Sequence, residues 1–318
     1  MDKPVLAVDL GGTKIRSAII SQEGRLITID NRPTQADKGF EHVINRLFDS
    51  IDTVLRKECM HAEEFSGIGI AIAGVLDSKN GILTSSPNLP HWKNVPLKQI
   101  IQDRLGLDTF LVNDANAAAL GEHRFGAGTG VQDLVYLTVS TGIGGGIIID
   151  GKLYEGSTGS AGELGHMTID ADGPLCNCGN YGCLEALASG TAVAREAIRC
   201  IKGGRMSILK DMKENVSYIT AEDVAKAARQ EDKLAMEIIA GAAYYLGIGL
   251  ANIVNIFNPQ VIVIGGGMSK MGGMLLEPAK RIVKQRAFKL PARAARIVRA
   301  HLGNDSGIIG AAVNVLNQ

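Results

Sequence analysis

The chain has 318 residues, of which 46% are hydrophobic and 21% are charged, and its 33 basic residues balance its 33 acidic ones. A chain of this size and composition can bury a large core and has room for two domains. With no net formal charge and no long run of Lys or Arg, it offers no electrostatic support for nucleic-acid binding. Its start, MDKPVLAVDLGG, enters a strand pattern without a secretory leader, so we expect a cytoplasmic protein.

Two segments that begin roughly 130 residues apart share a pattern of strand, glycine turn and strand. Residues 5–20 and 134–153 each predict a β-hairpin. The second segment continues as strand through Ile147, Ile148 and Ile149, whereas a dinucleotide fingerprint needs its glycine loop to begin a helix. The repeat therefore favours two halves of similar design, each a mixed sheet with helices packed on it, over a Rossmann fold.

The segments between the hairpins alternate between helix and strand patterns. Residues 39–59 predict an amphipathic helix, and residues 66–77 predict a strand followed by a turn. Residues 109–126 predict a short strand that breaks at Asn113-Asp114 into an alanine-rich helix. Farther along, Thr220 and Asp223 have a spacing close to that of a helix capping box.

The segment 236–257 is apolar and nearly long enough to span a membrane. One glutamate and two asparagines interrupt it, and its basic flanks are weak, so we expect a buried core helix instead. A strand over 260–269 and a helix from about Asp305 complete the expected elements. No low-complexity linker separates two halves, so element order alone places the domain boundaries near residue 115 and again near residue 300.

Three glycine-rich turns are candidate phosphate-binding loops, because glycine lets several backbone N–H groups approach one anion. Any one of them taken alone is more simply a tight turn, but three together favour a nucleotide. The pattern GxxxxGK[ST] is missing from the sequence, which argues against a P-loop protein. The loop residues are Asp9, Gly11, Gly12, Thr13 and Lys14, then Thr141, Gly142, Gly144 and Gly145, and finally Gly265, Gly266 and Gly267.

Asp114 stands where a strand is expected to end and a helix to begin. Open α/β sheets collect their ligands at such positions, so Asp114 is a candidate for chemistry. An aspartate at this position is equally suited to cap the helix, a role that needs no chemistry. The residue pattern leaves both interpretations open.

Three of the five cysteines fall within eight positions of the segment GHMTIDADGPLCNCGNYGCLEA, residues 165–186. Together, His166, Cys176, Cys178 and Cys183 supply three thiolates and one imidazole, the ligand set of a closed tetrahedral zinc site. In an expected cytoplasmic chain with an odd number of cysteines, disulfides are disfavoured, and the C-x-C spacing disfavours a thioredoxin-like redox centre. We therefore expect structural zinc. The other two cysteines lie on expected helices and are interpreted as buried small residues: Cys59 and Cys200.

The motifs DLGGTK, NDANAAALGE, STGIGGGII, AGELGH, CNCGNYGCLEA and IGGG occur in the order and approximate spacing of the ROK family of bacterial sugar kinases and repressors. From residue 5 to its end the chain resembles that family. The resemblance implies an α/β protein with the duplicated ribonuclease H-like fold of actin, hexokinase and Hsp70, with two domains around a central cleft. The expected domains are 1–115, completed by a C-terminal helix over 303–318, and 116–302, which carries the zinc loop.

The same resemblance implies an ATP-dependent hexose kinase. Asp114 would be the general base for attack of a primary hydroxyl on the γ-phosphoryl group, with Mg²⁺ on the phosphates and Asp9 near it. The zinc loop would present Glu163, His166 and Glu185 to sugar hydroxyls, the histidine binding zinc through one ring nitrogen and facing the sugar with the other. Sugar ligands implied outside this loop are Asn88, Asn113 and Asp114.

We expect phosphorylation of the glucose 6-hydroxyl, with N-acetylmannosamine, fructose or mannose as alternative substrates. A rival of another class is a sugar-sensing repressor, which in this family usually carries a DNA-binding domain ahead of the kinase-like part. Four residues precede the first expected strand, so no partner nucleic acid is expected. No membrane partner is expected either, because the apolar segment 236–257 is interpreted as a core helix. A catalytically inactive sugar binder is disfavoured because Asp114 and the DLGGTK turn are intact. The resemblance also implies a homodimer or a tetramer.

Overall fold

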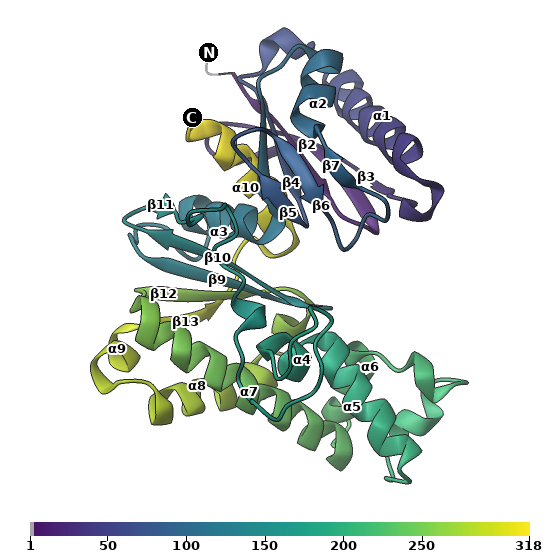
Figure 1. Ribbon diagram of the computed structural model, residues 1–318, viewed down its shortest axis with the longest axis vertical. Helices are drawn as coiled ribbons and strands as arrows, with labels where there is room; N and C mark the ends of the chain where they lie inside the picture. Colours follow the sequence, from purple (N-terminus) through teal and green to yellow (C-terminus); the bar gives the residue numbers. More distant parts are fainter. Residues whose placement is uncertain (1–2) are drawn as a thin grey trace. The chain divides into compact units, whose positions relative to one another are not determined.

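The computed structural model describes residues 3–318 (Figure 1). Contacts within the chain define two compact units. The first contains the chain up to Tyr136, together with Gly146–Gly162 and Ala300–Gln318, and the second contains Leu137–Gly145 and Glu163–Arg299. The expected boundary after residue 115 stays a prediction.

The first unit holds a five-stranded mixed sheet in the order β3-β2-β1-β4-β8. Its members are β1 (Val5–Leu10), β2 (Lys14–Ile20), β3 (Leu26–Pro33), β4 (Ile68–Ile72) and β8 (Thr109–Asn113). The first two strands form the antiparallel hairpin predicted over 5–20, and β3 extends it. On the other side β4 pairs in parallel with β1, and β8 pairs in parallel with β4. The carboxyl ends of β1, β4 and β8 therefore meet at one edge of the sheet.

The predicted helix over 39–59 is confirmed as α1 (Phe40–Glu58), which packs on β2 and β3. Its apolar face is fully buried at Val43, Leu47, Ile51 and Val54, and it covers one face of the sheet. The first unit also contains α2 (Leu97–Leu105) and a small antiparallel sheet of β5 (Val75–Asp77), β6 (Ile82–Ser85) and β7 (Lys93–Val95).

The second five-stranded sheet has the order β11-β10-β9-β12-β13. Its members are β9 (Leu134–Val139), β10 (Ile143–Ile149), β11 (Lys152–Leu153), β12 (Val261–Gly265) and β13 (Arg296–Arg299). Numbered along the chain, the strands of both sheets follow the same order, with the third, second and first strands followed by the fourth and fifth. The repeated hairpins predicted two halves of similar design, which the two sheets confirm. The protein thus has the duplicated ribonuclease H-like fold of actin and hexokinase that the family resemblance implies.

Helices of the second unit surround one long apolar helix. They are α4 (Leu184–Ala188), α5 (Gly190–Lys202), α6 (Ala221–Arg229), α7 (Lys233–Phe257), α8 (Gly273–Arg286) and α9 (Lys289–Ala294). The capping box of Thr220 and Asp223 is confirmed at the start of α6. By length and composition alone α7 is able to cross a membrane, but 61% of its apolar window is buried within the protein. Because α4, α5, α6 and α8 all contact it, α7 is the core helix that the sequence predicted.

Two further helices in the first unit, α3 (Asp114–Phe125) and α10 (Ser306–Leu316), pack together with almost no space between their backbones. A Cβ atom on Gly310 of α10 would lie 1.6 Å from the carbonyl oxygen of Ala117 in α3. On its other side α10 lies on β1 and β4, where a Cβ atom on Gly69 would lie 1.9 Å from the Ala311 carbonyl oxygen. The helix α10 begins 192 residues after the start of α3, from Asp114 to Ser306. Glycine at positions 69 and 310 lets α10 pack closely on both neighbours.

Of the two cysteines interpreted as buried, one was assigned wrongly. Cys200 is buried in α5, as predicted, but Cys59 is exposed. Cys59 follows the last residue of α1 in a left-handed conformation with φ of 52°. The apolar face of α1 ends before it, so the chain turns away from the core at this residue.

Candidate functional site

The fold brings two carboxylates together in the first unit. Asp9 lies near the carboxyl end of β1, and Asp114 directly follows β8, at the sheet edge where the parallel strands end. Burial, and to a smaller extent the negative charge of Asp114, raises the pKa of Asp9 to about 6, against the opposing charge of the Arg16 guanidinium. The two acidic groups thus act on each other, an arrangement typical of a functional site.

Asn113, the residue before Asp114, caps α3. Its side-chain oxygen accepts hydrogen bonds from the backbone N–H groups of Ala115 at 2.9 Å and Asn116 at 3.3 Å. The Asp114 carboxylate accepts a further bond from Ala115, at 2.9 Å. Of the two interpretations of Asp114, the N-cap position therefore belongs to Asn113. That Asn113 also binds sugar stays a prediction.

The glycine turn between β1 and β2 lies against the segment that carries Asn88. The turn is closed by a backbone hydrogen bond from Gly11 to Lys14 at 2.9 Å, as in a tight hairpin. A Cβ atom on Gly12 would lie 2.5 Å from the Asn88 carbonyl oxygen and 2.8 Å from its Cβ atom. Glycine is thus required here by the close approach of Asn88, a contact that the sequence did not indicate.

Glu185, a predicted sugar ligand, is bonded to the glycine turn between β9 and β10. Its Oε2 atom accepts a hydrogen bond from the backbone N–H group of Ile143 at 2.8 Å. A Cβ atom on Gly142 would lie 2.4 Å from the same oxygen, so this turn is shaped around the Glu185 carboxylate. The third glycine loop adjoins it, because a Cβ atom on Gly266 would lie 2.4 Å from the Val139 carbonyl oxygen. Two of the three candidate phosphate loops therefore meet in the second unit.

The four predicted zinc ligands converge. Their ligand atoms, one each from His166, Cys176, Cys178 and Cys183, all lie within 4.8 Å of one another. The Sγ atoms of Cys178 and Cys183 are 3.7 Å apart, and the Sγ atom of Cys176 is 3.7 Å from Nδ1 of His166. With zinc–sulfur bonds of about 2.3 Å, tetrahedral geometry places two sulfur ligands about 3.8 Å apart. The residues present therefore fit a tetrahedral zinc ion.

Two of the three clustered thiols resist ionisation when no cation is bound. Burial and the neighbouring thiols raise the pKa of Cys183 to about 12, and burial also raises the pKa of Cys176. A hydrogen bond from the Asn180 backbone lowers the pKa of the exposed Cys178. Buried thiols that resist ionisation next to one another become stable thiolates when they share a divalent cation.

His166 has a different neighbour on each ring nitrogen. Its Nδ1 atom faces Cys176, whereas its Nε2 atom lies 3.8 Å from the Oε2 atom of Glu163. The side chain of Glu163 is 61% exposed, and that of His166 is 35% exposed. One nitrogen is thus available to the metal cluster, while the other lies on the open side with Glu163.

The residue patterns missed Arg16, which lies in the middle of β2 with its side chain 15% exposed. Its guanidinium forms an ion pair with Asp305 and also donates to the backbone oxygen of Asn304. An arginine inside a strand with four apolar residues was the available signal. Through its charge, Arg16 opposes the rise in the pKa of Asp9.

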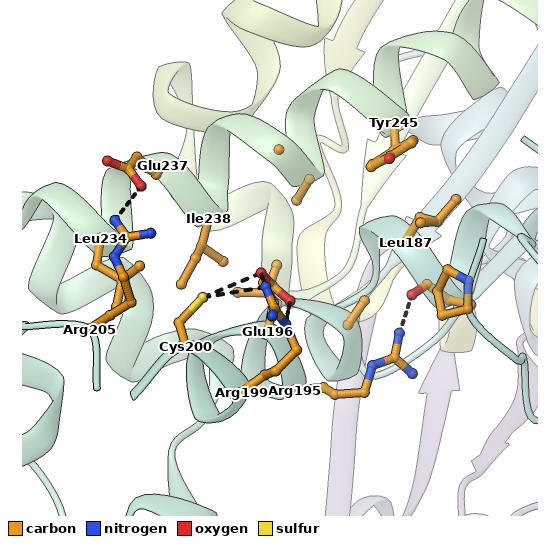
Figure 2. Close-up of a pocket in the computed structure, with 16 residues that line it drawn as sticks. Leu187, Arg195, Glu196, Arg199, Cys200, Arg205, Leu234, Glu237, Ile238 and Tyr245 are labelled. Atoms are coloured by element: carbon orange, nitrogen blue, oxygen red, sulfur yellow. Dashed lines mark hydrogen bonds and ion pairs between the residues drawn. The ribbon is translucent and has the colours of Figure 1, made fainter. Parts of the chain in front are cut away.

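A cavity of about 660 Å³ in the second unit contains none of the predicted site residues (Figure 2). Its walls come from α4, α5, α7, Arg205 after α5, and Pro174 of the cysteine segment. Each of its three arginines already has a hydrogen-bond partner: Arg195 donates to the Ala186 carbonyl oxygen, Arg199 pairs with Glu196 and Arg205 pairs with Glu237. We therefore assign no role to this cavity.

The fold and these clusters define a protein of the ROK family, and the chain belongs to that family, whose model matches residues 5–318. It is 38% identical over 308 residues to a glucokinase of Thermotoga maritima, covering 97% of this chain and 96% of the relative. It is 37% identical over 284 residues to a xylose repressor of Caldicellulosiruptor bescii, covering 89% of this chain and 71% of the relative. Among solved structures, a ROK family glucokinase from Streptomyces griseus in complex with glucose and AMPPNP has a TM-score of 0.83 and 34% identity, covering 97% of this chain and 98% of that one.

Proposed function

We propose that this protein is an ATP-dependent sugar kinase that phosphorylates the 6-hydroxyl of glucose. The observation that carries the proposal is the pair Asp9 and Asp114 at the carboxyl edge of the first sheet, with the helix cap supplied by Asn113 instead of Asp114. The similarity of this protein to glucokinases over nearly the whole chain supports glucose as the sugar.

In the proposed reaction Asp114 is the general base. Its carboxylate takes the proton of the sugar 6-hydroxyl as the oxygen attacks the γ-phosphoryl group of ATP, and ADP leaves. Bound Mg²⁺ would neutralise charge on the phosphates, and Asp9 is the residue proposed to lie near it. The glycine turns at Gly12, Gly144 and Gly266 would bring backbone N–H groups to the phosphates.

Sugar recognition is proposed for two groups of residues, each within its own unit. Asn88, Asn113 and Asp114 belong to the first unit, and Glu163, His166 and Glu185 belong to the second. That both groups bind the same sugar molecule stays a prediction from the family resemblance.

We propose that zinc at His166, Cys176, Cys178 and Cys183 is structural. Four protein ligands complete a tetrahedral shell, so no position is left to polarise a substrate oxygen. The metal would act by holding His166 and the segment that leads to Glu185. Support comes from the sulfur and nitrogen distances, which match a tetrahedral shell.

A second candidate function is that of a sugar-sensing repressor, favoured by 37% identity to a xylose repressor. The match spans 71% of that repressor, compared with 96% of the T. maritima glucokinase. We propose the kinase, acting in the cytoplasm where ATP is available, without a nucleic-acid or membrane partner, and as a homodimer or tetramer.

A coupled assay of ADP release over a panel of hexoses tests the proposed function. Glucose should give the highest kcat/KM, ahead of mannose, fructose and N-acetylmannosamine, and no ADP should form without sugar. Higher kcat/KM with another hexose would correct the substrate. If no hexose supports turnover while calorimetry still detects sugar binding, the protein is a sugar sensor and the kinase proposal fails.

A further inference from the structure

One buried carboxylate, Glu122, has no place in the proposed reaction. It lies in α3, is fully buried, and accepts four hydrogen bonds. Their donors are the backbone N–H groups of Ala127 at 2.9 Å, His301 at 3.0 Å and Leu302 at 2.8 Å, and the hydroxyl of Ser306 at 2.7 Å. A buried carboxylate is tolerated only when donors surround it in this way. Such a group holds its donors firmly in place.

Three of the four donors belong to the segment that leads into α10. His301 and Leu302 follow β13, and Ser306 is the first residue of α10. Glu122 therefore fixes the start of α10 from a position about 180 residues earlier in the chain. The close packing at Gly310 and Ala117 holds the rest of the same helix pair.

The start of α10 lies against Asp9. A Cβ atom on Gly307, the second residue of α10, would be 3.7 Å from the Oδ2 atom of Asp9. Asp305, directly before the helix, pairs with Arg16, whose charge also acts on Asp9. The surroundings of the Asp9 carboxylate therefore depend on where α10 begins.

We propose that Glu122 is a positioning residue for phosphoryl transfer: by holding residues 301–306 it sets the start of α10 beside Asp9. This inference rests on the proposed kinase function. Misplacement of a catalytic group by about 1 Å lowers a rate by about a hundredfold, so loosening this segment affects turnover without removing any group that touches substrate.

Glu122→Gln is the informative variant. The amide keeps the shape of the side chain, but its NH₂ group cannot accept a hydrogen bond, so at least one buried backbone N–H group loses its acceptor. That group is Leu302 if the NH₂ replaces Oε1, because the Ser306 hydroxyl also donates to the Gly303 carbonyl oxygen; both Ala127 and His301 lose theirs if it replaces Oε2. We expect kcat to fall at least about tenfold and the KM for ATP to rise, because Asp9 is displaced. Glucose affinity measured by calorimetry without ATP should stay within about threefold, because Asn113 still caps α3.

The matched control is Leu47→Ala, a fully buried residue of α1 in the same unit. It should lower the thermal midpoint without changing kcat or the KM for ATP when both variants are assayed at a temperature where they are folded. Equal kinetics for the two variants, or equal weakening of glucose and ATP binding in Glu122→Gln, would overturn the proposal. If Glu122→Gln does not fold, Ser306→Ala is the second variant, because it removes a single donor. It should lower kcat and raise the KM for ATP to a smaller extent, with glucose affinity unchanged. Wild-type kinetics in Ser306→Ala would count against the proposal.

Hydrogen exchange separates this inference from the proposed function, because it needs no turnover. Amides of residues 301–309 should exchange faster in Glu122→Gln than in the wild type, and no faster in Leu47→Ala. A wild-type protein that phosphorylates no hexose would refute the kinase function and, with it, the catalytic part of this inference. Unchanged exchange at 301–309 in Glu122→Gln would refute the anchoring of α10 whatever the activity.

Discussion

At the scale of single residues, Asn113 caps α3, and its neighbour Asp114 is the proposed general base. Asn113 bonds the first N–H groups of α3, so Asp114 is not needed as the N-cap. We therefore predict that Asp114→Asn lowers kcat by about a hundred- to ten-thousandfold, as expected for loss of a general base, with the fold intact by circular dichroism. ADP release measures this loss. Turnover above about a tenth of the wild-type value would contradict the assignment.

The raised pKa of Asp9 predicts a pH signature in stability. In the folded protein this pKa is about 6, against 3.8 as its ordinary value, so the fold favours the protonated carboxyl. The resulting stabilisation is complete below about pH 3.8 and is lost as the pH rises through about 6. In metal-free buffer the thermal midpoint of the wild type, relative to that of Asp9→Asn, should therefore fall between pH 4 and pH 7. A constant difference across this range would show that Asp9 is not perturbed.

At the scale of elements, Glu185 of α4 links this helix to the turn between β9 and β10 by accepting a hydrogen bond from the Ile143 backbone. Gly142→Ala places a Cβ atom against the Glu185 carboxylate and should weaken binding of both sugar and a non-hydrolysable ATP analogue. Gly144→Val is the comparison: it should raise the KM for ATP with little effect on sugar. Calorimetric titration with each ligand decides. A Gly142→Ala protein that loses only nucleotide affinity would contradict the coupling.

The cysteine segment has little apolar packing of its own. Cys176, Cys183 and Ala186 form a small buried cluster there, and Leu184 is buried as well. Structural zinc in finger peptides contributes roughly 10–16 kcal/mol of folding free energy. We predict that Cys178→Ala binds substoichiometric zinc and loses far more sugar affinity than ATP affinity, while both sheets stay folded. Metal analysis and calorimetry test this. A fully active preparation without zinc would refute the structural role.

At the scale of the whole molecule, the family resemblance predicts a homodimer or tetramer. Size-exclusion chromatography with light scattering on the purified full chain should give two or four times the mass of one chain. A monomer at micromolar concentration would contradict the prediction. Repeating the measurement on the Cys178→Ala protein would show whether assembly depends on the zinc segment.

The order and type of the main elements followed from the sequence. Both hairpins, α1, the capping box of α6 and the buried α7 came from alternation, helical spacing and local side-chain bonding. These features depend on residues a few positions apart, so they can be predicted from the sequence pattern. The motifs then pointed to the family, and the family model confirms it over residues 5–318.

Tertiary structure decided which residues meet. Gly12 must be small because of Asn88, Gly142 because of Glu185, and the donors that surround Glu122 lie up to 184 residues away. Cys59 is exposed because the apolar face of α1 ends before it, although its position on an expected helix suggested burial. Burial and hydrogen-bond partners are set by the segments that tertiary packing brings together. The spacing of residues along the chain does not predict which distant segments will meet. The sequence by itself thus determined the elements, the fold class and the family, and only the packing of α3, α10 and the glycine turns decided which of these residues act on one another.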